Sequence, residues 1–167
     1  MPKRILFLLI FIIAAIVFTD LGKHYTYSLL TNIVSNKAVP NIDPEELHAT
    51  EEPYVLLDVR TPEEYQVSHL KGAKVIDYNT FQADKMTDIP KDAQVVVYCS
   101  VGMRSSKAGL QLLEAGYKDV QNLRGGLFSW VNKGYPVFDA NGQTNRIHAY
   151  SRFWSYWLTE GEKVYGP

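Results

Sequence analysis

The chain has very little cysteine: Cys99 is the only one among its 167 residues. An intramolecular disulfide is therefore excluded, and the fold must depend on its own hydrophobic core. The histidines are scattered, and no pair has the spacing of zinc ligands, which argues against a structural zinc site. A lone cysteine is then either a buried apolar residue or a reactive thiol. The residues around Cys99 must decide between the two.

An excess of basic charge is also lacking. The chain has 17 Lys and Arg against 18 Asp and Glu, with a formal net charge of -1. Its longest basic cluster is Lys3-Arg4, whereas binding to phosphate backbones needs concentrated Lys and Arg. We therefore expect no nucleic acid partner. No internal repeat is evident, and the length suits one globular domain with short appendages.

The first residues have the pattern of an export signal. Lys3 and Arg4 precede a run from Ile5 to Phe18 that contains no polar residue. As a helix this run would be roughly 21 Å long, shorter than a bilayer core of about 30 Å, which favours a signal peptide over a membrane span. Extension through Leu21 would instead give a membrane anchor, with the basic pair on the cytoplasmic side. Residues 1–20 are predicted to be one or the other, placing the protein in the periplasm or on the outer face of the cytoplasmic membrane.

Two further appendages flank the predicted domain at 42–137. Residues 21–41 are predicted to be a tether with a short helix at Tyr27 to Val34. Residues 138–167 form an aromatic C-terminal extension containing Tyr150, Phe153, Trp154, Tyr156 and Trp157. Packing back on the domain is the ordinary interpretation of such a cluster. Contact with a membrane surface or a partner is the alternative, since exposed aromatic residues often mark interfaces.

The domain alternates strand and helix patterns. Apolar runs predict strands at 54–59, 74–78, 94–98 and 120–123. Capping residues and helical spacing predict helices starting at Pro44 and Pro62, a helical stretch at 81–86, and helices at 105–115 and 127–133. This alternation predicts an α/β fold with a parallel sheet, in which ligands bind beyond the carboxyl ends of the strands. Cys99 stands at that position, directly after the run Gln94 to Tyr98.

The loop after this strand is Cys99-Ser100-Val101-Gly102-Met103-Arg104-Ser105. A tight turn between a strand and a helix can aim backbone N–H groups at one point, and Gly102 can take the positive φ that such a turn requires. The following helix adds the partial positive charge of its N-terminus, and Arg104 adds a fixed cation. This field favours a thiolate at Cys99 facing a small anion, the arrangement that nucleophilic catalysis needs. The alternatives for Arg104 are a helix cap or a pair with a carboxylate.

The motif Cys-x-x-Gly-x-Arg-Ser resembles the active-site loop of rhodanese-type sulfurtransferases. Residues 57–65 with 69–73 are similar to the opening motif of that family, and 123–126 with 134–137 are similar to its closing motif. The three motifs occur in the expected order over roughly 42–137. The resemblance implies a rhodanese-like three-layer fold, with a parallel sheet of about five strands flanked by helices.

The same resemblance implies a chemistry. Cys99 would take a sulfane sulfur from thiosulfate or a persulfide donor and pass it, as a persulfide, to a small-molecule or protein thiol. Arg104 would be catalytic beside Cys99, and the substrate-binding loop would comprise Ser100, Val101, Gly102, Met103 and Ser105. Asp58, Arg60 and His69 are predicted to be structural supports. No metal or organic cofactor is implied.

Two features qualify this expectation. Four residues separate Cys99 from Arg104, whereas phosphate-hydrolysing look-alikes have five, so phosphatase activity is less favoured. Ser100 stands where many thiosulfate-using members have a basic residue, which weakens the attraction for a dianionic donor. The competing functions are a non-catalytic rhodanese-like binding module in the cell envelope and a redox sensor that oxidises at Cys99.

Overall fold

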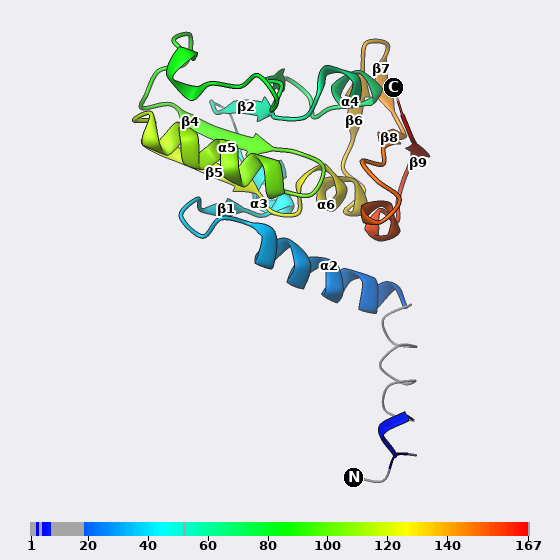
Figure 1. Cartoon of the computed structure of the whole chain (residues 1–167). Helices are drawn as coiled ribbons and strands as arrows, with labels where there is room; N and C mark the ends of the chain where they lie inside the picture. Colours follow the sequence, from blue (N-terminus) through cyan, green and yellow to red (C-terminus); the bar gives the residue numbers. More distant parts are fainter. Residues whose placement is uncertain (1–2, 4, 8–18, 52, 167) are drawn as a thin grey trace.

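The computed structural model describes residues 3, 5–7, 19–51 and 53–166. In chain order its helices and strands are α2 (Asp20–Val34), β1 (Asn41–Ile42), α3 (Pro44–Ala49), β2 (Val55–Asp58), α4 (Pro62–Val67), β3 (Lys74–Val75), η1 (Ala83–Lys85), β4 (Gln94–Tyr98), α5 (Met103–Glu114), β5 (Asp119–Leu123), α6 (Gly126–Asn132), β6 (Val137–Asp139), β7 (Gly142–Thr144), β8 (Arg146–His148), η2 (Trp154–Trp157) and β9 (Glu162–Val164). Figure 1 shows the sheet between α5 on one side and α3 and α6 on the other. The predicted α/β class is therefore confirmed.

The main sheet is five-stranded and parallel, in the order β1-β5-β4-β2-β3. At its centre Val97 of β4 lies opposite Leu57 of β2 and Asn122 of β5. Two small additions lie outside it: β6 pairs antiparallel with β7, and β8 pairs parallel with β9. The parallel sheet predicted from the alternating pattern is confirmed, and so is the number of about five strands that the resemblance implied.

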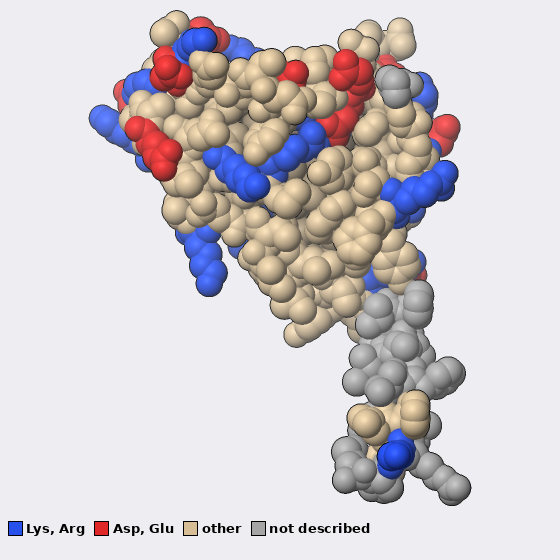
Figure 2. Space-filling view, viewed as in Figure 1, with Lys and Arg blue, Asp and Glu red and all other residues tan. Residues whose placement is uncertain are grey.

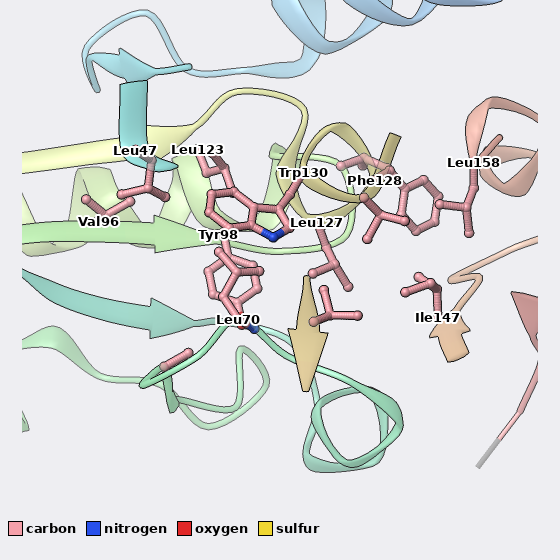
Figure 3. Close-up of a cluster of buried hydrophobic side chains, with 14 of the residues drawn as sticks. Leu47, Leu70, Val96, Tyr98, Leu123, Leu127, Phe128, Trp130, Ile147 and Leu158 are labelled. Carbon is pink, nitrogen blue, oxygen red and sulfur yellow. The ribbon is translucent and has the colours of Figure 1, made fainter. Parts of the chain in front are cut away.

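The side chains of β4 and the residue after it supply both faces of the core. Val95, Val97 and Cys99 belong to a buried cluster with residues of α5, and Val96 and Tyr98 belong to a cluster on the opposite face. This alternation follows from the period of two along a strand. Figure 3 shows the second cluster, where side chains from the sheet and α6 meet. Cys99 is thus placed on the α5 side of the sheet by strand geometry alone.

The predicted strand at 74–78 is shorter in the structure. β3 ends at Val75, although Ile76 N still donates to Asp58 O at 2.8 Å. Beyond it the Asp77 carboxylate accepts from Asn79 N at 3.0 Å, which turns the chain away from the sheet. The helix predicted at 105–115 instead begins at Met103, because the loop before it completes its turn at Gly102.

The N-terminal helix α2 is longer than predicted and packs on the domain. It begins after Thr19, whose hydroxyl accepts from Gly22 N at 3.0 Å. Tyr27 is buried, and its hydroxyl donates to Gly125 O at 2.5 Å. Residues 21–41 are therefore part of the packed structure, in contrast to the predicted tether. Sequence periodicity did not reveal this, because the partners of α2 lie about a hundred residues away.

The C-terminal extension packs back on the domain, as its ordinary interpretation expects. Ile147 and Leu158 are buried beside Phe128 of α6 (Figure 3). Trp157 is also buried, and its indole N–H donates to Thr26 Oγ1 of α2 at 2.9 Å. The extension and α2 therefore pack against each other as well as against the domain.

The predicted signal peptide or anchor falls mainly on residues 8–18, which lie outside the described residues. In the part of the chain that the structure describes, no helix is both long and apolar enough to cross a membrane.

Candidate active site

Cys99 lies directly after β4, where the loop begins that leads into α5. Its side chain is fully buried. The backbone N–H of Gly102 donates to Cys99 Sγ at 3.2 Å, and Gly102 has a φ of 91°. A non-glycine residue rarely takes this conformation, so Gly102 allows the loop to curl and aim its amide at the sulfur. The N-terminus of α5 starts at the next residue and adds its partial positive charge.

The start of α6, where the predicted closing-motif segment 123–126 ends, is hydrogen-bonded to this loop. Leu127 N donates to Cys99 O at 2.8 Å, and Phe128 N donates to Ser100 O at 3.0 Å. A Cβ on Gly126 would collide with the carbonyl oxygen of Cys99, and the φ of Gly126 is 58°. The start of α6 can therefore approach the Cys99 loop this closely only because residue 126 has no side chain.

Arg104 does not point at an open anion site; it is paired with a carboxylate. Arg104 Nη1 donates to Glu64 Oε2 at 2.6 Å, and Nη2 donates to Oε1 at 2.7 Å. Ser100 Oγ also donates to Glu64 Oε1, at 3.0 Å. The structure shows the carboxylate alternative for Arg104, and direct contact of Arg104 with a bound anion stays a prediction. The reason is that α4 and the start of α5 meet across the carboxyl ends of the strands, where Glu64 can reach both partners.

The charge state of Glu64 follows from these contacts. Burial alone would raise the pKa of this carboxyl, but the hydrogen bonds and charge of Arg104 outweigh it and lower the pKa to about 2. Burial likewise acts against the charge on Arg104, and the bonds to Glu64 raise its pKa overall. The pair is therefore a fully ionised bidentate ion pair, the geometry for which a guanidinium is best suited.

The C-terminal extension completes this side of the site. The Tyr150 ring lies 4.7 Å from the Arg104 guanidinium carbon, in cation–π geometry. Tyr150 has a positive φ of 59°, which is uncommon for a non-glycine residue. Its backbone N–H donates to His148 Nδ1 at 3.2 Å, and burial lowers the pKa of His148. His148 is therefore neutral, and its 3.7 Å approach to Glu64 is not an ion pair.

The remaining loop residues are engaged within the protein. Ser105 Oγ donates to Asn122 Oδ1 of β5 at 2.6 Å, and Ser105 is fully buried. Val101 belongs to the core, and Met103 packs against it. Cys99 Sγ accepts its hydrogen bond from the Gly102 amide. The side chains of Ser100 and Ser105 thus fix the shape of the loop.

The predicted structural supports make buried or stacked contacts next to the loop; they are Asp58, Arg60 and His69. The Asp58 carboxylate accepts from Arg60 Nε at 2.9 Å and from Nη2 at 2.6 Å, and both side chains are fully buried. Arg60 Nη2 also donates to Ser68 O at 2.6 Å. The His69 ring stacks on Tyr65 with centroids 3.8 Å apart. These contacts join β2 to the segment that follows α4.

Sequence reasoning missed three residues at this site. Glu64 was given no role of its own within the opening motif at 57–65; in the structure it completes a capping box with Thr61 and also holds Arg104. Its place in the opening motif was the signal that pointed to a further role. Tyr27 and Tyr150 carried no such signal. Burial, followed by the electrostatic effect of Cys99, raises the pKa of Tyr27, so its phenol is neutral.

Within the described ranges 19–51 and 53–166, no cluster of His, Cys, Asp and Glu side chains is arranged to hold a metal ion. Beside Cys99, the Gly102 amide and the N-terminus of α5 are able to act on a ligand at the sulfur. Together they can stabilise a single anionic sulfur.

Residues 43–133 match the family model described as the rhodanese-like domain. A sulfurtransferase from Allochromatium vinosum is 37% identical over 107 residues, which cover 62% of this chain and 99% of that protein. Thiosulfate sulfurtransferase 18 of Arabidopsis thaliana is 34% identical over 94 residues, or 48% of this chain and 69% of that protein. The crystal structure of a rhodanese-related protein from Thermoplasma volcanium is 28% identical, with a TM-score of 0.54 over 59% of this chain and 96% of that one.

Proposed function

Because this chain belongs to the rhodanese-like domain family, whose curated relatives include named sulfurtransferases, we propose that it transfers sulfane sulfur through a persulfide on Cys99. The observation that carries the proposal is the Gly102 amide, 3.2 Å from Cys99 Sγ, at the start of α5. A backbone donor and a helix N-terminus at one sulfur favour a negative charge there.

The reaction has two steps. In the first, the Cys99 thiolate attacks the outer sulfur of the donor, a new S–S bond forms, and sulfite or a thiolate leaves with the electrons of the broken bond. In the second, an acceptor thiolate attacks the outer sulfur of the persulfide and releases the Cys99 thiolate. Both steps place charge on a sulfur beside the Gly102 amide, and neither needs an external oxidant.

The ion pair of Arg104 argues for a persulfide donor over thiosulfate. Glu64 neutralises the Arg104 charge, and Ser100 supplies no charge of its own. Neutralising Arg104 therefore weakens the attraction for a dianionic donor more than that for a monoanionic or neutral one. In this proposal Arg104 positions the loop through Ser100 Oγ, 3.2 Å from Arg104 Nη2.

Access to the thiol requires movement. Cys99 is fully buried. The donor must therefore approach after the residues around the thiol shift. The same burial favours, as the second candidate, a non-catalytic binding module whose thiol is structural.

We also propose that the protein acts outside the cytoplasm. The support is the sequence pattern at residues 1–20, with Lys3-Arg4 ahead of the apolar run from Ile5 to Phe18. Fractionation of cells producing the full chain tests this, and recovery only in the cytosolic fraction would overturn it.

Mass spectrometry of the purified full chain tests the sulfur transfer. The reduced protein is incubated with thiosulfate or with glutathione persulfide, beside the Cys99→Ser variant. We expect a gain of one sulfur atom on the wild type, larger with the persulfide, absent in the variant and reversed by an excess of thiol. If folded, reduced wild type gains no sulfur from either donor, the binding module is the better description.

A further inference from the structure

Between residues 21 and 33 the exposed residues of α2 carry no formal charge, whereas Asp20 at the start of the helix is exposed and charged. From residue 21 to 33 its exposed large apolar side chains are Leu21, Tyr25, Leu29 and Ile33, which are 75%, 77%, 57% and 69% exposed. The other exposed residues of this stretch, His24, Ser28 and Asn32, are formally neutral. A surface helix of a water-soluble domain normally presents charged and polar residues on this side. The exposed side of α2 therefore carries more large apolar side chains than the solvent-facing side of such a helix normally does.

The apolar residues are too widely spread for a narrow helix–helix seam. They recur every four residues, and each step of four advances about 40° around a helix of 100° per residue. Four such residues cover about 120°, which is wider than the strip that two coiled helices share. A broad, flat partner fits this face better than a second helix. The inner face of α2, with Tyr27 and Thr31, is buried against the domain and leaves the outer face free for that partner.

The surroundings extend this face. Phe153 of the C-terminal extension is 63% exposed, and its ring lies 5.1 Å from that of Trp157, which is hydrogen-bonded to Thr26 of α2. Figure 2 shows a mostly uncharged surface where Figure 1 places α2, with a few charged side chains at its two ends and most of the others above it. An exposed apolar patch of this kind marks an interaction site.

Continuity with the preceding sequence identifies the partner. The apolar run from Ile5 to Phe18 ends only one residue before α2 begins at Asp20. An apolar medium that takes up that run is therefore next to the first residues of α2. Tyr25 also suits the boundary between lipid and water, where aromatic residues with a polar end gather.

We propose that the outer face of α2, comprising Leu21, Tyr25, Leu29 and Ile33, lies in the surface of a lipid bilayer. The helix is then parallel to the bilayer plane, with its apolar side chains among the acyl chains near the headgroups. Its inner face is at the same time joined to the domain by the Tyr27 hydroxyl, which donates to Gly125 O directly before α6. The domain is thereby held against the bilayer on the side of α2.

Site-specific fluorescence in vesicles tests this placement. The full chain, in a Cys99→Ser background, carries either Leu29→Cys or Gln111→Cys labelled with a nitrobenzoxadiazole dye. Gln111 is exposed on α5, which packs on the opposite face of the sheet, and is the matched control. Both proteins are reconstituted into vesicles of phosphatidylcholine and phosphatidylglycerol, with or without phosphatidylcholine brominated near the headgroup. Because both keep the N-terminal run, anchoring by that run is the same in each.

The proposal expects a blue-shifted emission at position 29 and quenching by brominated lipid several-fold stronger than at position 111. Equal, weak quenching at both positions would show that α2 faces water and would overturn it. A blue shift at position 29 without lipid quenching, with energy transfer between labelled copies, would assign this face to a second copy and also overturn it. Leu29 is more than half exposed, so its replacement leaves the core intact.

Discussion

Replacing Glu64 with glutamine removes the charge that pairs with Arg104 while keeping the size of the side chain. The magnitude follows from the pKa of Glu64, which is lowered from 4.5 to about 2 in the folded protein. A shift of this size at 1.36 kcal/mol per unit corresponds to about 3 kcal/mol of stability for the ionised over the neutral side chain. The Glu64 side chain is only 6% exposed, so solvent screening reduces this little. We expect Glu64→Gln to lower the free energy of unfolding by about 3 kcal/mol at pH 7.

The difference between wild type and variant should depend on pH. Because the folded pKa is the lower one, the contribution of Glu64 is fully present above the unfolded value of 4.5 and is lost as the pH falls toward 2. At pH 3 about 2 kcal/mol of it should be gone. Urea unfolding of the full chain in non-ionic detergent, followed by tryptophan fluorescence at pH 7, 5, 4 and 3, measures this difference.

A surface variant provides the control. Glu114→Gln changes an exposed carboxylate at the end of α5, and we expect it to alter the free energy of unfolding by less than about 0.5 kcal/mol at each pH. If Glu64→Gln cost the same at pH 3 as at pH 7, the ion pair would not be the source of the effect. If it cost nothing at pH 7, the reasoning from burial and charge would be wrong.

Two further changes test how the Cys99 loop is held and covered. Gly126→Ala should destabilise the protein more than Gly134→Ala in the same unfolding assay. Both glycines have a positive φ, but only a Cβ at residue 126 would collide with backbone, at Cys99 O. Equal losses of unfolding free energy in the two variants would contradict the close approach of α6 to the Cys99 loop. Tyr27→Ala should destabilise by about 3–5 kcal/mol and increase the rate of Cys99 alkylation by a small maleimide under folded conditions, whereas Tyr27→Phe should keep the thiol covered. Alkylation as slow in Tyr27→Ala as in wild type would show that α2 does not guard the thiol.

Local patterns were sufficient for the framework of the fold. The β-branched run Gln94–Tyr98, the cap at Thr61 and the glycine at 102 each act within a few residues, so their effects could be interpreted from sequence. The placement of Cys99 at the carboxyl end of a central strand follows from the same local rules. The boundaries of β3 and α5 were less accurate, because loop hydrogen bonds at Asp77 and the turn at Gly102 decide them.

Long-range partners of the site could not be predicted in this way. Tyr27 lies 98 residues from Gly125, and Glu64 lies 40 residues from Arg104. A sequence pattern states which residues are suited to pair, but it does not state which of them the folded chain brings within hydrogen-bond reach. For Arg104 the choice between an anion and a carboxylate depended on where α4 meets α5.

By itself, then, the sequence determined the α/β framework, the position of the thiol after β4 and the family motifs, because these depend on short-range periodicity and turn chemistry. The tertiary structure alone decided that Arg104 is neutralised by Glu64, that Tyr27 bonds to Gly125 while Tyr150 lies over Arg104, and that one side of α2 stays uncovered. These features arise from packing between distant segments, where burial and geometry select one partner among several that are chemically suitable.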